Sequence, residues 1–287
     1  MVEHKNFIDT HVHFWDLANE YPWIENSNND NLKQNYLIDN FIDDSKNLPL
    51  KKVVHVQAEI NVKNKIIETE WLQNLSDNHA LGFPNAIVGF VDLLDIKAEK
   101  DFEEHKNFKN FRGIRQILKS KNIQNDLLLN DIWLKNFDLL KKYDLSFDML
   151  IYYSQYKQAI DLIKNFPSVQ FIINHCLWPE ESISDFEGWK NAVREVSKFE
   201  NVAIKISGFG EWKTNWTTEF ISDYVNIAID SFGTKRCMFA SNFPVDKFIS
   251  NSSYDSFWLS YYKIVSNFSA SEIDDLLVNN AEQYYKI

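Results

Sequence analysis

Phe7-Ile8-Asp9-Thr10-His11-Val12-His13-Phe14-Trp15-Asp16 is the first apolar run of the chain, and it alternates in polarity as a strand does. His11 and His13 are two residues apart, so on a strand their side chains point to the same face. Two imidazoles on one face at a strand end can share a metal ion or polarise one carbonyl group. One H-x-H pair among seven histidines is a weak motif, so its meaning depends on how the later strands end.

The rest of the chain alternates between short apolar runs and amphipathic stretches. This alternation predicts a parallel sheet, and eight such units in 287 residues fit a (β/α)8 TIM-type barrel in a single domain over residues 1–287. An open doubly wound sheet is the alternative, but no G-x-G-x-x-G follows the first strand. Later strands are predicted over 51–60, 86–93, 111–118, 145–152, 169–176, 202–207 and 237–243. Helices are predicted over 38–46, 63–78, 98–109, 126–142, 155–165, 184–199, 217–231, 253–267 and 269–279.

Composition narrows the class of protein. Hydrophobic residues make up 45% and charged residues 25%, as in ordinary globular proteins, and the net charge of −11 argues against nucleic acid or anionic membranes as partners. Cys176 and Cys237 lie far apart in apolar runs, which predicts buried free thiols in a reducing compartment. No signal-peptide pattern or membrane-length apolar run is visible, so we expect a cytoplasmic protein.

Polar side chains stand at the ends of most predicted strands. In a (β/α)8 barrel these ends form one mouth, and charged groups there need partners or a function. We therefore expect one site built from His11, His13, His55, Gln57, Glu59, Arg112, Arg115, Asp148, Tyr152, His175, Lys205, Ser207, Ser241, Asn242 and Asp246.

Structural roles compete with functional ones at several of these positions. Glu59 could form an ion pair with Lys205 or with an arginine across the barrel. His55 lies deeper in its strand and is expected to be a core histidine. Arg112 and Arg115 are three residues apart and cannot share a face, so Arg115, nearer the strand end, is the one expected to point inward.

Tryptophans fall in the predicted strand-to-helix loops. Most tryptophans are core residues, but at a barrel mouth they can form an apolar wall for a ring-shaped ligand. The candidates for such a wall are Trp15, Trp23, Trp178 and Trp212.

Five segments occur in order along the chain: residues 7–16, His55-Val-Gln-Ala-Glu59, Phe111-Arg-Gly-Ile-Arg115, Asn174-His175 and Arg236-Cys-Met-Phe-Ala-Ser-Asn-Phe-Pro-Val-Asp246. Together they resemble the amidohydrolase superfamily, and most closely its amidohydrolase-2 branch of sugar-acid lactonases and pyrone-dicarboxylate lactonase. The resemblance covers nearly the whole chain. It implies a distorted (β/α)8 barrel and hydrolysis of a C–O ester bond in a lactone ring.

The resemblance also implies roles for the histidines. His11 and His13 match the family's strand-one pair, and His175 matches its strand-six histidine. Two alternatives stay open: one divalent ion, such as zinc, held by these three residues, or a metal-free site. No lysine ends the fourth predicted strand, so a binuclear site bridged by a carbamylated lysine is not expected.

The chain departs from the family pattern at its eighth strand. Many members carry an acidic residue directly before the aromatic-proline step, whereas this chain has Asn242, which cannot accept a proton at neutral pH. Asp246 is the nearest carboxylate and the expected general base, with Glu59 as the alternative. Leu177 and Trp178 also follow His175 where a glycine often stands.

These expectations combine into a lactone hydrolase for a small sugar-acid or carboxylated lactone. The catalytic residues would be His11, His13, His175 and Asp246, with the histidine cluster polarising the carbonyl group. The substrate would be bound by Gln57, Glu59, Arg115, Lys205, Asn242 and Trp178. Two other hypotheses remain: a metal-dependent decarboxylase of the same superfamily, and a non-catalytic binder of small molecules.

Overall fold

Eight parallel strands make one sheet, in which each strand is hydrogen-bonded to the next along the chain. The sheet closes into a barrel where Val12 bridges Phe243 and the N–H of His13 donates to the Phe243 carbonyl at 2.7 Å. The predicted (β/α)8 fold is therefore confirmed. The computed structural model describes residues 5–61, 63, 65–118, 130–179 and 185–287. The strands are β1 (Phe7–Val12), β2 (Leu50–Val56), β3 (Ala86–Gly89), β4 (Phe111–Ile117), β5 (Ser146–Leu150), β6 (Phe171–Ile173), β7 (Val202–Ile206) and β8 (Cys237–Phe239).

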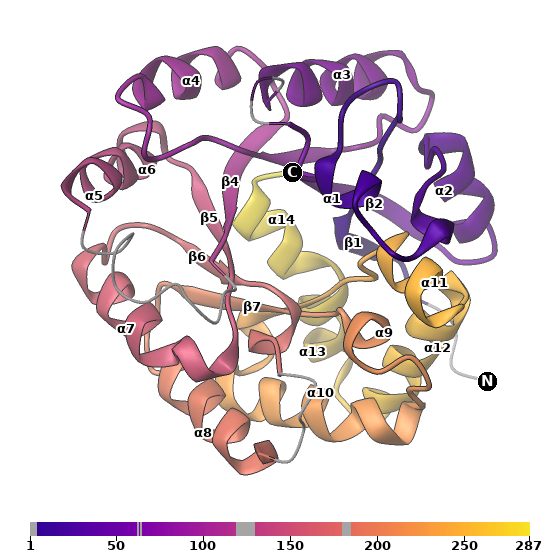
Figure 1. Cartoon of the computed structure of the whole chain (residues 1–287). Helices are drawn as coiled ribbons and strands as arrows, with labels where there is room; N and C mark the ends of the chain where they lie inside the picture. The colour runs from indigo at the N-terminus through magenta and orange to yellow at the C-terminus, as the bar shows by residue number, and fades with distance from the viewer. Residues whose placement is uncertain (1–4, 62, 64, 119–129, 180–184) are drawn as a thin grey trace.

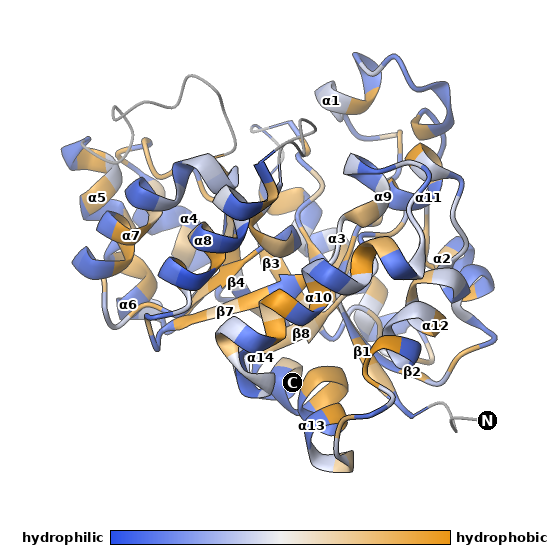
Figure 2. Ribbon diagram, turned by 90° about the horizontal axis from the view of Figure 1, so that it is seen from below, coloured by the Kyte–Doolittle hydropathy of each residue, from blue (hydrophilic) through white to orange (hydrophobic). Residues whose placement is uncertain are grey.

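Helices surround the barrel and lie at both of its ends. Figures 1 and 2 show the outer ring, with α1, α9 and α11 toward one end and α13 and α14 at the other. The outer helices are α2 (Ile38–Ser45), α3 (Lys65–Asn78), α4 (Ala98–His105), α5 (Asp131–Phe137), α6 (Leu139–Tyr143), α7 (Tyr156–Asn165), α8 (Phe186–Val196), α10 (Thr218–Phe232) and α12 (Tyr254–Ile264). Those at the ends are α1 (Pro22–Glu25), α9 (Phe209–Trp212), α11 (Val245–Ser250), α13 (Ala270–Asp274), the π-helical turn η7 (Asp275–Asn279) and α14 (Asn280–Tyr285). The remaining turns are the 3₁₀ segments η1 (Asp30–Leu32), η3 (Tyr153–Gln155), η4 (His175–Leu177) and η6 (Thr234–Arg236).

Several predicted elements have different bounds in the structure. Most strands end earlier than predicted, because the polar residues that follow them leave the hydrogen-bonded ladder at the mouth. The predicted helix 126–142 begins outside the described residues and is divided into α5 and α6 at Asp138. Helices α1, α9 and α11 were not predicted, because segments of four to six residues show too little helical periodicity.

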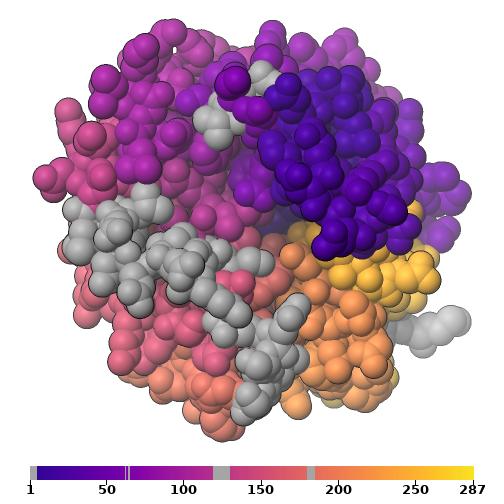
Figure 3. All heavy atoms as spheres, in the orientation of Figure 1, coloured from indigo at the N-terminus to yellow at the C-terminus, as the bar shows by residue number. Residues whose placement is uncertain are grey.

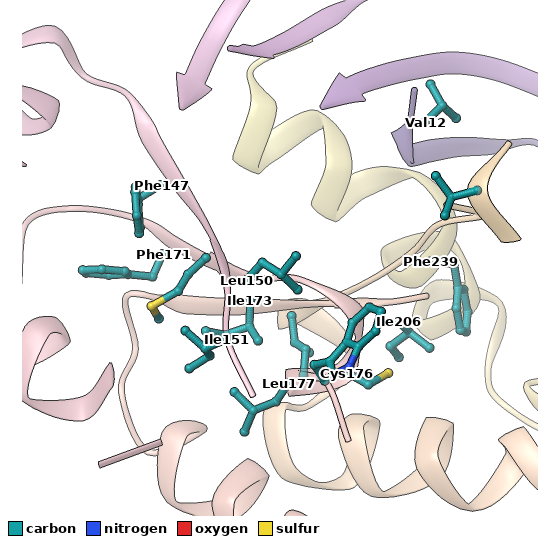
Figure 4. Close-up of a cluster of buried hydrophobic side chains, with 14 of the residues drawn as sticks. Val12, Phe147, Leu150, Ile151, Phe171, Ile173, Cys176, Leu177, Ile206 and Phe239 are labelled. Atoms are coloured by element: carbon teal, nitrogen blue, oxygen red, sulfur yellow. The ribbon is translucent and has the colours of Figure 1, made fainter. Parts of the chain in front are cut away.

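The strands bury both of their faces, as expected for a parallel barrel. Residues of one face fill the barrel interior, and Ala281 and Tyr285 of α14 join them, so the C-terminal helix covers the end of the barrel opposite the mouth. The other face packs against the helices; Figure 4 shows part of this layer, including Phe147, Phe171 and Phe239. The residues inside the barrel include Ile8, Val54, Val56, Ala86, Val88, Ile172, Ala203 and Met238.

The polar segment after β1 packs across the end of the barrel where the strands finish. Its Asn29 side chain donates to the Phe248 carbonyl at 3.1 Å, and its Asp44 pairs with Lys247 at 2.6 Å. In Figure 3 the indigo atoms of this segment lie against the orange atoms of the C-terminal third. An N-terminal excursion therefore forms part of the wall at the mouth.

The burial of both cysteines agrees with the expectation from their apolar surroundings. Cys176 and Cys237 are both buried free thiols. Among the described helices, none combines the length and the apolar character needed to cross a membrane.

Candidate functional site

A cavity of about 200 Å³, which we call the inner compartment, lies at the ends of the strands. It brings together residues that are far apart in the sequence but follow different strands. Its lining combines three cations or imidazoles with two carboxylates, which is typical of a site for a polar reacting group. The lining residues are His13, Trp23, Ala58, Glu59, Arg115, Ile117, Leu150, His175, Glu211, Asn242 and Val245.

The predicted histidine pair is in direct contact. Nε2 of His11 lies 3.2 Å from Nε2 of His13, and Nδ1 of His13 lies 2.7 Å from the Val56 carbonyl oxygen. A carbonyl oxygen only accepts, so Nδ1 of His13 carries the proton and Nε2 accepts one from Nε2–H of His11. Nδ1 of His11 is then an unprotonated, buried atom, and it has no hydrogen-bond partner.

Burial keeps this pair neutral. It is the largest cause that lowers the pKa of His11 and of His13 well below the usual value of 6.5. Positive charges add to the effect: His175 and Lys205 act next on His11, and Arg115 acts next on His13. At neutral pH the two rings therefore serve as hydrogen-bonding groups rather than as cations.

His175 is held in a strained turn after β6. His175, Cys176 and Leu177 have φ of 51°, 53° and 60°, a region that costs roughly 1–2 kcal/mol per non-glycine residue. Nδ1 of His175 lies 2.9 Å from Oγ of Ser207, and its ring centroid lies 4.4 Å from that of His11. Three left-handed residues in succession bring this imidazole to the histidine pair, as strain at a functional site often does.

Because Gly208 has no side chain, the ring of His175 can occupy the space beside it. Its φ is +81°, and a Cβ atom built on it would lie 2.8 Å from both Cγ and Nδ1 of His175. Real Cβ atoms do not approach ring atoms so closely, so a glycine is required here for both its backbone angle and its size.

Arg115 points inward and Arg112 does not, as predicted. Arg115 is only 4% exposed, and one Nη atom donates to the Gln57 carbonyl at 2.5 Å. Its Nε atom is buried without a hydrogen-bond partner. A buried guanidinium stays charged, so Arg115 brings a positive charge to the lining of the inner compartment.

Lys205 also points into the barrel, but it lies beneath the inner compartment rather than on its wall. Its Nζ is 2.5 Å from Oδ1 of Asp148, and both side chains are fully buried. Asn174 donates to the same oxygen at 2.9 Å, and the Tyr285 hydroxyl lies 3.1 Å from each carboxylate oxygen. Lys205 therefore pairs with Asp148. It does not form the ion pair with Glu59 that was one structural alternative raised by the sequence.

Asp246 lies behind the wall of the inner compartment. It is fully buried, and its oxygens accept from Gly210 N at 2.8 Å and from Asn242 Nδ2 at 2.6 Å. Burial raises the pKa of Asp246 well above its usual value, and the charge of Glu211 adds to this. The predicted base is therefore placed where it holds Asn242, whose φ is 57°.

Glu211 is the carboxylate that lines the inner compartment on this side. Its Oε2 lies 3.3 Å from Nδ2 of Asn242. Glu211 was not predicted from the sequence, because it lies in the unpredicted helix α9. Its position only a few residues beyond the end of β7 was a signal that could have identified it.

Glu59 and a buried neighbour form the opposite wall. Glu59 has φ of 54°, and its N–H donates to the Gln57 side chain at 2.5 Å. Glu68 of α3 accepts from the Ala58 N–H at 2.8 Å, and its second oxygen is buried without a partner. Burial raises the pKa of Glu68 to about 7, against the opposing influence of Arg115. Glu68, also missed from the sequence, supports the loop that carries Glu59.

Among the candidate tryptophans, Trp23 lines the inner compartment. Its Nε1 donates to the Ala58 carbonyl at 2.6 Å, which fixes the indole at the mouth. Trp178 instead packs edge-on against the His175 ring at 5.6 Å, while Trp15 and Trp212 are core residues. His55 is buried beside His13 with its pKa lowered to about 3 by burial, as expected for a core histidine.

The histidines form only part of a metal site. Two nitrogen ligands of a tetrahedral zinc ion lie about 3.4 Å apart, similar to the 3.2 Å between Nε2 of His11 and Nε2 of His13. Within the described residues, however, no group of three or more His, Cys, Asp or Glu side chains converges as a metal site. The arrangement is therefore incomplete for a metal.

Comparison with known proteins supports the resemblance. The chain is 39% identical over 295 residues to an uncharacterized protein, y4mH, of Sinorhizobium fredii, covering 98% of each chain. It is 24% identical over 267 residues to an L-fucono-1,5-lactonase of Burkholderia ambifaria, covering 88% of this chain and 86% of the relative.

The fold recurs in solved structures. An amidohydrolase of Burkholderia multivorans crystallised with bound zinc matches with a TM-score of 0.86 at 23% identity, covering 99% of this chain and 100% of that one. A family model described as Amidohydrolase, Amidohydro_2, matches residues 8–287. With its barrel, its histidine cluster and this match over nearly its whole length, the chain belongs to the Amidohydro_2 family of amidohydrolases.

Proposed function

We propose that this protein hydrolyses the ester bond of a lactone ring in the inner compartment. The observation that supports the proposal most is the placement of opposite chemistries around one small cavity. Arg115 offers a hydrogen-bond donor beside the rings of His13 and His175 on one side, and Glu211 offers a carboxylate beside Asn242 on the other. This is the arrangement that addition of water to a carbonyl group requires.

The carbonyl oxygen of the lactone would be bound by the unpartnered Nε–H of Arg115, beside the rings of His13 and His175. This cation would stabilise the negative charge that develops on the oxygen as water adds. Because the guanidinium is already buried and fixed, it needs little reorganisation during the reaction. The neutral state of His11 and His13 leaves Arg115 as the cation nearest the developing charge.

We propose Glu211 as the general base. It would take a proton from water as the water oxygen bonds to the carbonyl carbon, and return that proton to the ring oxygen when the C–O bond breaks. The product is one open chain with an alcohol and a carboxylic acid, and the acid then loses its proton to the solvent to become a carboxylate. Asp246 would be a positioning residue that holds Asn242, and Glu59 is the alternative base because it lines the same compartment.

A lactone panel with a pH indicator tests the activity, since ring opening releases acid. We expect turnover by the wild type and a loss of two or more orders of magnitude in His13→Ala and His175→Ala, with cooperative unfolding retained. His79→Ala is the matched control, because His79 accepts only a local hydrogen bond from the Leu81 N–H at 3.2 Å. Full activity in either site variant would contradict the proposal.

The base is tested separately. Glu211→Gln should lower kcat and remove the acidic limb of the pH–rate profile. Asp246→Asn should lower kcat less and keep that limb, because Asp246 acts through Asn242. If Glu59→Gln rather than Glu211→Gln removes the limb, the roles of the two glutamates are exchanged.

The other two hypotheses predict different results from those of a lactone hydrolase. A small-molecule binder would give ligand-induced shifts in Tm without acid release, and Asn242 in place of an acid is the feature that favours it. A decarboxylase would release carbon dioxide from a carboxylic acid and would require bound metal, which metal analysis of the purified protein detects.

A further inference from the structure

We infer that the lactone carries an apolar substituent, which lies in a second cavity beside the inner compartment. This inference rests on the proposed function and concerns the class of substrate. The second cavity, which we call the outer compartment, has a volume of about 450 Å³, compared with about 200 Å³ for the inner one. The reacting ring would lie in the inner compartment and its substituent in the outer one.

The two compartments adjoin each other. Trp23, Glu59 and Ile117 line both, so a molecule bound in one contacts the boundary of the other. The Trp23 indole is fixed by its hydrogen bond to the Ala58 carbonyl, and it packs edge-on against Trp15 at 5.8 Å. A fixed aromatic side chain between two cavities suits a substrate that spans them.

Apolar side chains dominate the outer compartment. Leu94 is 44% exposed there, although leaving apolar surface in water is unfavourable. The lining comes from the ends of β2, β3 and β4 and from α1: Pro22, Trp23, Gln57, Glu59, Ile60, Asn61, Phe90, Leu94, Gln116, Ile117 and Leu118.

The amide side chains of this lining are already hydrogen-bonded within the protein. Gln57 accepts from the Glu59 N–H at 2.5 Å, and Gln116 accepts from the Trp133 indole at 2.7 Å. Asn61 donates to the Glu20 carboxylate at 2.6 Å. A polyhydroxylated chain would have to compete for these bonded amide atoms, whereas an alkyl or aryl group needs no hydrogen bonds. The outer compartment therefore favours an apolar substituent over the hydroxylated tail of a sugar acid.

Two simple lactones test the inference: δ-valerolactone, and δ-decalactone, which has the same ring with a five-carbon chain. Each fully buried methylene favours binding by about fourfold, from ~0.8 kcal/mol per CH₂. The outer compartment is partly open and the chain must be ordered, so we expect a total gain in kcat/KM of about 10- to 100-fold for δ-decalactone. Equal kcat/KM values for the two lactones would overturn the inference.

A pair of variants locates the effect. Leu94→Asn should lower the ratio of the two kcat/KM values by about fivefold or more, because it places a polar group against the substituent. Leu259→Asn is the matched control: Leu259 is also 44% exposed, but it lies on α12 and lines neither compartment. An unchanged ratio in Leu94→Asn, or an equal fall in both variants, would contradict the assignment.

Binding of the ring-opened products distinguishes failure of this inference from failure of the proposed function. Calorimetry should show tighter binding of 5-hydroxydecanoate than of 5-hydroxypentanoate by about tenfold, lost in Leu94→Asn. If neither lactone is hydrolysed but this difference is observed, the outer compartment stands and the lactonase proposal fails. If lactones are hydrolysed without any chain-length effect on rate or binding, the outer compartment is not a subsite.

Discussion

Gly208→Ala should displace His175 without replacing any side chain that lines the inner compartment. The substitution therefore tests whether the position of this imidazole matters for activity. An alanine Cβ would lie 2.8 Å from Cγ and Nδ1 of His175 and 2.9 Å from its Cβ. All of these are closer than real Cβ contacts, so either the imidazole or the backbone of the turn must move. His175 cannot move freely, because its Nδ1 lies 2.9 Å from Oγ of Ser207 and its turn is left-handed.

The expected cost has two parts. Placing alanine at φ +81° costs roughly 1–2 kcal/mol, and overpacking a buried contact costs roughly 1–3 kcal/mol. We therefore expect a loss of about 2–5 kcal/mol in the free energy of unfolding and a fall in Tm of roughly 3–8 °C. A displacement of the imidazole by about 1 Å should also lower kcat/KM by about 100-fold.

Urea unfolding and lactone kinetics measure these two effects. Gly82→Ala is the control, because Gly82 has φ of +65° and no atom within 4 Å of the added Cβ. It should lose only about 1 kcal/mol and keep its kcat/KM, since no side chain is pushed. A Gly208→Ala protein with wild-type stability and activity would refute the view that Gly208 positions His175.

Three further predictions follow from other buried groups. Lys205→Met should destabilise the protein by about 3–5 kcal/mol in urea unfolding, because it leaves the fully buried Asp148 without its cation, and a loss below 1 kcal/mol would contradict this. Arg115→Lys should lower kcat/KM by about 100-fold or more, because lysine has no equivalent of the Nε–H, and wild-type kinetics would remove Arg115 from the carbonyl site. Glu68 has its pKa raised from 4.5 to about 7, so the folded state holds a proton that the unfolded state releases, and stability falls as pH rises between these values. Glu68→Gln should remove this decline, which amounts to about 3 kcal/mol at most, as measured by unfolding at pH 4.5 and pH 7.5; an unchanged decline would assign it to another group.

The order of strands and helices could be read from the sequence, because it depends on local periodicity. The three-residue spacing selected Arg115 over Arg112 as the arginine that points inward. The ends of the strands predicted part of the cavity lining, namely His13, Glu59, Arg115, His175 and Asn242. Element bounds were less well predicted, because the strands stop where non-local pairing stops.

Only the tertiary structure decided which carboxylate and which tryptophan line the cavity. Asp246 follows β8 closely in sequence, but hydrogen bonds from Gly210 and Asn242 hold it behind the wall, and Glu211 takes the place on the cavity side. Trp23 rather than Trp178 forms the apolar wall, because an excursion from the N-terminal part of the chain returns to the mouth.

The sequence by itself therefore determined the barrel, the histidine pair and the inward arginine. The partners of the buried charges came only from the folded chain: Lys205 pairs with Asp148 across 57 residues, and Asn242 lies between two carboxylates. The physical reason is the range of the forces involved. Backbone sterics and side-chain alternation act over a few residues, whereas burial and charge pairing depend on which distant strands close around the same space.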